Sequence, residues 1–299
     1  MSEEKFEYKF IGNIILKGKI VCKTALHIGG SKDAYEIGGM DNPVIKTIRG
    51  EPYIPGSSLK GKMRSLLEWS LDEKDKPGPD EQKEEADKNN GKTRFGCRCG
   101  SPTCPICRIF GTPAETKRGF GPTRLVVRDA FMESTSKEKL QELGRTTELK
   151  MENTIDRISG KAEHPRPIER VPEGTVFAFS MVYSLYSVGN EDYQKDLEMF
   201  PHVLDAMALL EDSYLGGMGS RGSGQVEFRN IKVVFRSKGY YLKGELEKPV
   251  LKIRYEKLKE DKKKECPEFT ELRITEQEKR QILIELAEAI SDENPGSQS

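Results

Sequence analysis

Four cysteines placed close together give the clearest chemical signal in this sequence. They are Cys97, Cys99, Cys104 and Cys107, in the pattern C-x-C-x4-C-x2-C. Four thiolates at such spacing can surround one tetrahedral zinc ion, and four cysteine ligands leave no open position, so the site is predicted to be structural. Disulfides and free thiols are the alternatives, and disulfides are uncommon in a reducing cytosol. His164 could replace one thiolate, whereas Cys22 and Cys266 are predicted to bind no metal.

An isolated carboxylate, Asp41, is a second candidate for chemistry. It stands in a loop between glycines and Pro43, and by itself it is better explained as a turn residue than as a catalyst. The chain has only three histidines, and no Ser-His-Asp order stands out among them. His27 falls on the polar side of an alternating strand pattern over residues 14–28, so it is predicted to point away from the core.

The segment 57–71 is predicted to be a helix with one buried face. Apolar residues recur in it at three- and four-residue spacing. They are Leu59, Met63, Leu66 and Leu67, with Ser70 in the same register. Ser57 or Ser58 could cap the helix start, and the preceding Gly56 would let a ligand approach the backbone closely.

Three cations give the same helix a basic surface. Lys60 and Arg64 lie one turn apart, and Lys62 lies beside them. A helix N-terminus carries unpaired N–H groups and the positive end of the helix dipole, so it attracts phosphate. The segment is therefore either a phosphate-binding element or an ordinary solvated amphipathic helix.

A glycine-rich loop over residues 216–225 is a further candidate for anion binding. Successive N–H groups in such a loop can form an anion nest, and Arg221 would add positive charge. A flexible connector is the alternative. The loop has no Gly-Lys-Ser/Thr before a helix, so nucleotide hydrolysis is disfavoured.

The periodicity predicts an α+β fold. Strands are predicted over 14–28, 123–132, 175–186 and 225–235, and helices over 57–71 and 193–215, the latter ending at Gly216-Gly217. The order strand, helix, strand, strand, helix, strand is typical of a ferredoxin-like, RRM-like sheet with helices on one face. A last helix is predicted over 276–290, with Thr275 and Glu278 as its capping box.

Long insertions interrupt this core. The core is assigned to 1–56, 120–132 and 174–240 with the helix 57–71, and the remainder to insertions 72–119 and 133–173 and an extension 241–299. Residues 72–94 lack apolar side chains and are predicted to be disordered. Net charge is zero, which excludes a uniformly basic nucleic-acid coat but not local basic patches. Without a long apolar run or signal peptide, a soluble cytoplasmic protein is expected.

Eight segments resemble, in order, one group of the RAMP superfamily. They are HIGG at 27–30, MDNPVI at 40–45, PYIPGSSLKGKMR at 52–64, RIFG at 108–111, VRDA at 127–130, ENTIDR at 152–157, PRPIERVP at 165–172 and LGGMGSRGSGQV at 215–226. The group is the repeated backbone subunit (Cas seven group) of type III-A CRISPR Csm effector complexes. The resemblance covers about two thirds of the chain, and the helix after Thr275 lies outside it.

The resemblance implies a modified ferredoxin-like palm with a protruding thumb hairpin, stacked as a filament along CRISPR guide RNA. The implied partners are guide RNA, target single-stranded RNA, further copies of the chain and other Csm subunits, without a membrane. Target RNA would be cut at regular intervals with a divalent metal such as magnesium or manganese. The implied catalytic residues are Asp41, His27 and Lys60. The implied RNA-binding residues are Ser57, Ser58, Lys60, Lys62, Arg64, Glu148, Glu152, Arg157, Arg166, Gly217, Gly219, Ser220, Arg221 and Gly222.

Other functions compete with this one. A non-catalytic RNA-binding filament subunit is the main alternative, and the loop acid Asp41 favours the cutting subunit over it. A repeat-RNA processing nuclease acting alone would rely more on histidine or lysine clusters. A zinc-ribbon transcription factor would need a recognition helix beside the cysteines, which the pattern does not predict.

Overall fold

The computed structural model describes residues 8–30, 42–71, 96–113, 121–188, 193–253 and 276–291. Several sequence predictions lie outside these residues. They concern Asp41, the polar loop 72–94, Cys266, Thr275 and the side chains of His164 and Glu278.

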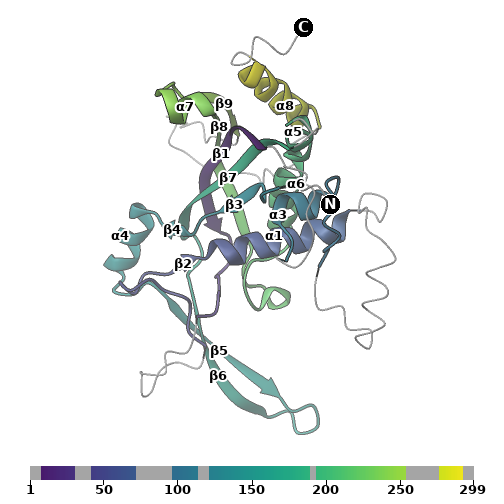
Figure 1. The fold of residues 1–299 in the computed structure, drawn as a ribbon. Helices are drawn as coiled ribbons and strands as arrows, with labels where there is room; N and C mark the ends of the chain where they lie inside the picture. The colour runs from purple at the N-terminus through teal and green to yellow at the C-terminus, as the bar shows by residue number, and fades with distance from the viewer. Residues whose placement is uncertain are drawn as a thin grey trace.

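One antiparallel sheet of seven strands forms the centre of the described chain (Figure 1). The strand order is β2-β4-β7-β1-β8-β9, and β3 also pairs with β7. The strands are β1 Tyr8–Cys22, β2 Tyr53–Ile54, β3 Leu125–Val127, β4 Ala130–Met132, β7 Val176–Val188, β8 Val226–Ser237 and β9 Lys248–Ile253. The long strands β1 and β7 pair from Tyr8↔Val188 to Val21↔Val176, so together they form the spine of the sheet.

Helices pack on one face of this sheet and close the core (Figure 1). They are α1 Gly56–Ser70, α3 Pro105–Phe110, α5 Gln194–Met199, α6 Pro201–Glu211 and α8 Glu276–Ser291. Two further helices, α4 Ser134–Glu142 and α7 Lys238–Lys243, lie at the margins of the sheet. Among the described residues, no helix combines the length and apolar character that crossing a membrane requires.

The alternating apolar residues of β1 and β7 face the helices. In β1 the buried set includes Ile14, Leu16, Ile20 and Cys22, and in β7 it is Phe177, Phe179, Met181, Tyr183 and Leu185. Burying one such side chain contributes about 1.5–3 kcal/mol, so these rows are a large part of the driving force for folding. The predicted inward faces of both strands are confirmed.

Several predicted boundaries are wrong, each for a local reason. The first strand ends at Cys22, because residues 23–28 leave the sheet and Leu26 pairs instead with Val171. The strand predicted over 123–132 is two short strands. The helix predicted over 193–215 is broken at Pro201, which has no N–H to donate, and its second half ends at Glu211 rather than at the glycines.

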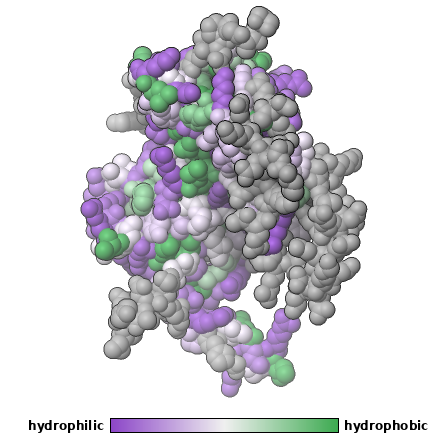
Figure 2. All heavy atoms as spheres, in the orientation of Figure 1, coloured by the Kyte–Doolittle hydropathy of each residue, from purple (hydrophilic) through white to green (hydrophobic). Residues whose placement is uncertain are grey.

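A separate two-stranded sheet protrudes from the body of the molecule (Figure 1). Its strands are β5 Glu148–Ile155 and β6 Ala162–Arg170, within the insertion predicted over 133–173. Leu149, Met151 and Ile155 alternate along β5 and are exposed. Figure 2 shows hydrophobic side chains among hydrophilic ones on this hairpin. Such an exposed apolar row suits contact with another molecule rather than with water.

One buried carboxylate joins α3, α5 and the central sheet. Asp196 accepts from Arg108 Nε at 2.5 Å and from Arg124 Nε at 2.7 Å, and all three side chains are fully buried. The same carboxylate accepts from the amide of Tyr186 in β7 at 2.9 Å. Arg108 follows the last cysteine of the cluster directly, so this ion triad anchors the cysteine segment to the sheet.

We expect Asp196→Ala to lower the free energy of unfolding by about 3–5 kcal/mol, because it strands two buried guanidinium groups without their counter-charge. Urea denaturation followed by circular dichroism measures this loss. The control is Asp212→Ala, which removes an exposed carboxylate beside α6 and should cost under about 0.5 kcal/mol. Equal stability of the two variants would contradict a structural role for the triad.

Candidate functional site

His27 is enclosed by the glycine-rich loop. Its side chain is only 8% exposed, so the side of the strand away from the core, where His27 was predicted to lie, is covered by other segments of the chain. The amide of Gly217 donates to the carbonyl of His27 at 2.8 Å. A Cβ at Gly216 would lie 2.2 Å from the same carbonyl oxygen, and Gly216 has a φ of +78°. Only glycine allows this approach, so the loop serves here to pack against His27.

One ring nitrogen of His27 makes a hydrogen bond that holds the imidazole in place. Its Nδ1 lies 2.7 Å from the carbonyl oxygen of Glu169 in β6. A carbonyl oxygen can only accept, so Nδ1 carries the proton and Nε2 of the neutral ring is an acceptor. The hydrogen bond therefore fixes both the orientation and the tautomer of the ring.

The side chain of Glu169 joins three separate segments. Its carboxylate accepts from the amide of Val44 at 2.8 Å and from the hydroxyl of Thr147 at 2.6 Å, and it pairs with Lys46. Glu169 is 3% exposed, and this burial opposes ionisation. The hydrogen bonds from Lys46, Thr147 and Val44 outweigh burial and hold the pKa of the carboxyl below its ordinary value.

Glu169 was missed by sequence reasoning as a site residue. It lies in the PRPIERVP segment, between two strand-forming stretches, and its partners are more than 120 positions away except for Thr147. The available signal was that Glu169 follows Ile168 in a strand whose apolar residues are buried, because a carboxylate at a buried position needs nearby donors.

Residues 42–45 are held against residues 28–30. The amide of Gly30 donates to the carbonyl of Pro43 at 3.0 Å, and the amide of Ile45 donates to that of Ile28 at 2.9 Å. The amide of Glu169 donates to the carbonyl of Asn42 at 3.3 Å. These three hydrogen bonds hold residues 42–45 against the segment of His27 and the strand of Glu169.

The glycine-rich loop uses many of its amides internally. The amides that donate to backbone carbonyls are those of Gly217, Arg221, Gly222, Ser223 and Gly224. An anion nest made from these five N–H groups is therefore a wrong prediction. The 3₁₀ turn Gly219–Arg221 instead presents the Arg221 side chain, which pairs with Glu152 of the hairpin at 2.7 Å.

Helix α1 begins against the β3–β4 connection. The amide of Gly56 donates to Asp129 Oδ1 at 2.7 Å, and Pro55 occupies the N-cap position. A Cβ at Gly56 would lie 2.3 Å from the carbonyl oxygen of Val127. The predicted serine cap is wrong, and Gly56 is needed for packing of the helix rather than for a ligand. Ser57 is exposed and Ser58 is half-buried.

The three cations of α1 point to different partners. Lys60 donates to the carbonyl of Leu125 at 2.8 Å, and burial, with Arg64 nearby, lowers its pKa. Lys62 lies 3.8 Å above the ring of Tyr214, next to the glycine-rich loop. Arg64 donates to carbonyls of the cysteine segment. The helix therefore has no single basic patch.

The hairpin residues named by the resemblance lie along the protruding sheet. Glu148 pairs with Arg170 at 2.5 Å across the two strands, and Glu152 pairs with Arg221 of the glycine-rich loop. Arg157 and Arg166 are exposed. Glu169 and Glu152 thus tie the hairpin to the site. Two exposed arginines lie on the same hairpin, Arg166 directly opposite Glu152 and Arg157 just beyond the end of β5.

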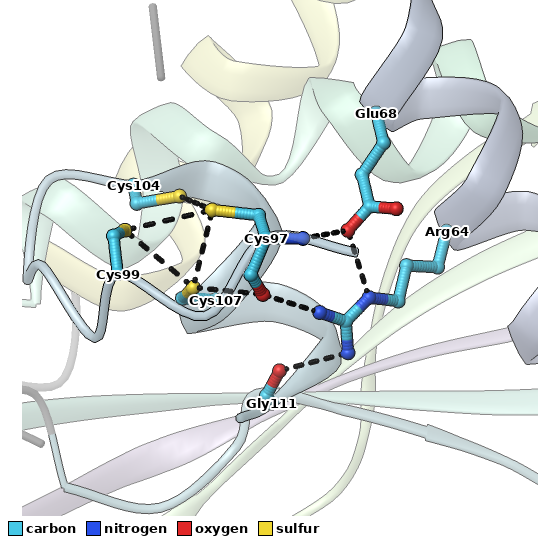
Figure 3. A network of polar contacts seen from close by, with 7 residues as sticks. All are labelled: Arg64, Glu68, Cys97, Cys99, Cys104, Cys107 and Gly111. Atoms are coloured by element: carbon cyan, nitrogen blue, oxygen red, sulfur yellow. Dashed lines mark hydrogen bonds and ion pairs between the residues drawn. The ribbon is translucent and has the colours of Figure 1, made fainter. Parts of the chain in front are cut away.

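The four cysteines form a compact sulfur cluster (Figure 3). Sγ–Sγ distances are 3.6 Å for Cys97–Cys99 and Cys99–Cys107, and 3.7 Å from Cys97 to Cys104 and Cys107. A tetrahedral ion with bonds of about 2.3 Å requires sulfurs about 3.8 Å apart, so the set fits one metal ion. Cys22 lies in the core, where burial raises its pKa to about 12, which makes it a poor ligand.

The fold and the motifs define a family. The RAMP superfamily profile matches residues 19–227, and the chain belongs to that superfamily. Curated relatives carry the name CRISPR system Cms endoribonuclease Csm3. The protein from Methanothermobacter thermautotrophicus is 43% identical over 78% of this chain and 90% of its own length. The protein from Methanocaldococcus jannaschii is 40% identical over 77% of this chain and 84% of its own length.

A solved structure is similar as well. In the crystal structure of the Csm3-Csm4 subcomplex of a type III-A CRISPR-Cas interference complex, one chain is 29% identical, with a TM-score of 0.51. The alignment covers 82% of this chain and 91% of that one. Its antiparallel α+β fold therefore agrees with the sheet and helices described above.

We expect Glu169→Gln to lower the free energy of unfolding by about 1–3 kcal/mol at pH 7, because a charge-assisted buried network loses its charge. The depressed pKa adds stability that is present above the unfolded-state value and lost as pH falls through the folded value. The difference from wild type should therefore shrink as pH falls below about 4.5. Urea denaturation between pH 7 and pH 3 measures it.

The matched control is Glu173→Gln, an exposed acid just beyond β6. It should leave the free energy of unfolding within about 0.5 kcal/mol of wild type at every pH. A Glu169→Gln deficit that stays constant or grows on acidification would contradict a native carboxylate with a depressed pKa.

Proposed function

We propose that the chain is the guide-RNA-binding backbone subunit of a type III-A CRISPR interference complex, and that it cleaves target single-stranded RNA. The observation that carries this proposal is the 43% identity over most of the chain to a protein named as the endoribonuclease Csm3. The similarity to a chain of the Csm3-Csm4 subcomplex supports assembly with other Csm subunits.

In this proposal the sheet and its helices are a modified ferredoxin-like palm. The hairpin β5–β6 is the thumb, and its exposed apolar row would meet RNA bases or a neighbouring copy. We assign 72–119 and 133–173 to insertions and 241–299 to a C-terminal extension. The palm is made of 1–56, the helix 57–71, 120–132 and 174–240. The Arg221–Glu152 pair supports a thumb that is held to the palm through the middle of β5.

We propose structural zinc as the metal of the cysteine cluster. Four sulfur donors in tetrahedral separation suit zinc, and they leave no position for a substrate. The ion would hold together residues 96–113, a segment of mostly irregular backbone in which the regular element is the six-residue helix α3. The cluster would be a folding element of the subunit rather than its cutting site.

Cleavage would proceed by attack of an RNA 2′-hydroxyl on the adjacent phosphorus. The new O2′–P bond forms, the P–O5′ bond breaks, and the products are a 2′,3′-cyclic phosphate and a 5′-hydroxyl. Asp41 would accept the hydroxyl proton or hold a magnesium or manganese ion. Its chain neighbour Asn42 is fixed by Glu169, which supports a carboxylate presented beside His27. The Nε2 atom of His27 is a second candidate acceptor.

Guide binding would rest on phosphate contacts, which hold any spacer sequence because they read no bases. Lys62 lies over the ring of Tyr214, just before the glycine-rich loop, and Arg221 is a member of that loop. Both keep donors available beyond their present partners, since an ammonium has three N–H groups and a guanidinium five. Base pairing between guide and target would then supply the specificity.

A non-catalytic filament subunit is the second candidate function. The observation that favours it is that the described site residues are largely committed to structural hydrogen bonds, as for His27 and Glu169. Such a subunit would hold guide and target RNA without cutting. The first of the two experiments below separates the candidates.

We expect Asp41→Ala to reduce target-RNA cutting at least about 100-fold, because a base or metal ligand acts mainly in the transition state. Guide affinity should stay within about twofold, since a lost acid removes no phosphate contact. The assay follows labelled target RNA with magnesium or manganese in the assembled complex, beside a gel shift on the same RNA.

Asp33→Ala is the control, an acid of the same loop outside the MDNPVI motif. It should cut at the wild-type rate. If Asp41→Ala also cuts at that rate, the chemistry belongs to another residue, and if the wild-type complex does not cut, the non-catalytic function is the correct one.

We expect Lys62→Ala combined with Arg221→Ala to weaken guide binding to every sequence alike. The slope of log affinity against log salt should become shallower by about one per lost contact, about two in all. Filter binding of two unrelated guides at several salt concentrations measures both effects. A matched control, Lys139→Ala in α4, should change neither. A loss confined to one guide would contradict phosphate contact.

A further inference from the structure

We infer that Arg64 and Glu68 of helix α1 are the positioning residues of the cysteine metal centre, and that they set its affinity for metal. The two side chains stand one turn apart on α1 and reach out to the cysteine segment (Figure 3). The inference depends on the structural metal proposed above, and it is independent of RNA binding and cutting.

The pair holds Cys97 from both sides of its backbone. Glu68 Oε1 accepts from the amide of Cys97 at 2.8 Å, and Arg64 Nη2 donates to the carbonyl of the same residue at 2.6 Å. Arg64 Nε in turn donates to Glu68 Oε1 at 3.1 Å, which closes the ring of contacts. The first ligand of the cluster therefore has its backbone position fixed by a helix outside the cluster.

The same guanidinium reaches the other end of the segment. Arg64 Nη1 donates at 3.0 Å to the carbonyl of Gly111, which lies just after α3. One planar group thus joins Cys97 to Gly111 and sets the distance between the start and the end of the metal-binding segment. A lysine would fit these two carbonyls less well, because its three N–H groups all lie on one nitrogen whereas the guanidinium donates from separate nitrogens.

Gly96, the residue before Cys97, lies close to the carboxylate of Glu68. A Cβ at Gly96 would lie 2.3 Å from a carboxylate oxygen of Glu68, so a larger residue before Cys97 would have to displace this carboxylate from its present position. The glycine therefore lets the Glu68 carboxylate lie directly against the chain where it can accept from the amide of Cys97.

The partners of Arg64 favour the same assignment. Because Arg64 is paired with Glu68, the two side chains together add no net charge to the centre, and they act on it through their hydrogen bonds. Arg64 provides a guanidinium whose three named contacts all lie on the centre's own segment or on Glu68. The structure therefore assigns Arg64 to the metal centre in place of a phosphate, and leaves Lys62 as the cation of α1 nearest the glycine-rich loop.

The test measures zinc affinity by competition with a chromophoric chelator under reducing conditions, on the full chain. Arg64→Ala should weaken zinc binding about 10–100-fold, as expected for groups that orient metal ligands. Arg64→Lys should fall between Ala and wild type, and Glu68→Gln should weaken binding less than Arg64→Ala. Arg280→Ala removes an exposed arginine of α8 and should bind zinc within twofold of wild type.

A second readout separates positioning from general stability. Thermal unfolding is compared for the zinc-loaded and the chelator-stripped protein, and the absorption spectrum of the cobalt-substituted protein reports ligand geometry. Arg64→Ala should lower the melting temperature more in the loaded than in the stripped protein, and it should alter the cobalt spectrum. Equal shifts in both forms with an unchanged spectrum would make Arg64 merely structural and overturn the inference.

The outcomes distinguish the proposals. Wild-type protein that retains no zinc would overturn both the structural zinc and this inference. Wild-type zinc binding together with unchanged affinity in Arg64→Ala would overturn only the inference. If Arg64→Ala does not fold, zinc affinity is compared for Arg64→Lys and Glu68→Gln instead. Wild-type affinity in both of these variants would overturn the inference.

Discussion

The buried carboxylate of Asp196 is the interaction on which the architecture of the described chain depends. A single acid lies between Arg108 and Arg124, with no solvent contact for any of the three. Because an unpaired charge in such a place is costly, α3, α5 and the entry to β3 can only adopt positions that keep the triad together. The cysteine segment is thereby fixed on its α3 side to the sheet, while Arg64 and Glu68 fix its other side to α1.

A second carboxylate, Glu169, has the same role at the candidate RNA site. It fixes the segment after Asp41, the base of the hairpin and the imidazole of His27 in one network. Cutting RNA demands a reactive group held in position but reachable by a long flexible substrate. The buried Glu169 supplies rigidity of this kind to residues 42–46, the segment that directly follows Asp41 in the chain.

Helix α1 links the β3–β4 connection to the cysteine segment. Its N-terminus packs against the β3–β4 connection through Gly56 and Asp129, and its last turns hold the cysteine segment through Arg64 and Glu68. Lys62 leans on Tyr214 beside the glycine-rich loop. Loss of the metal would therefore loosen a helix that also borders the candidate RNA surface, which gives a structural centre an influence on function without any contact to RNA.

The sequence by itself determined the features that depend on local pattern. Local pattern predicted which residues of β1, β7 and α1 are buried, because the spacing of neighbouring apolar residues sets the buried face. The spacing of the four cysteines likewise predicted that their sulfur atoms lie together. Tertiary structure alone decided which cation serves which partner. Arg64 faces a segment 33 positions away and His27 a strand 142 positions away, and no local spacing encodes such pairs. Long-range packing chooses them, since a buried polar group takes whichever partner the fold brings within hydrogen-bond distance.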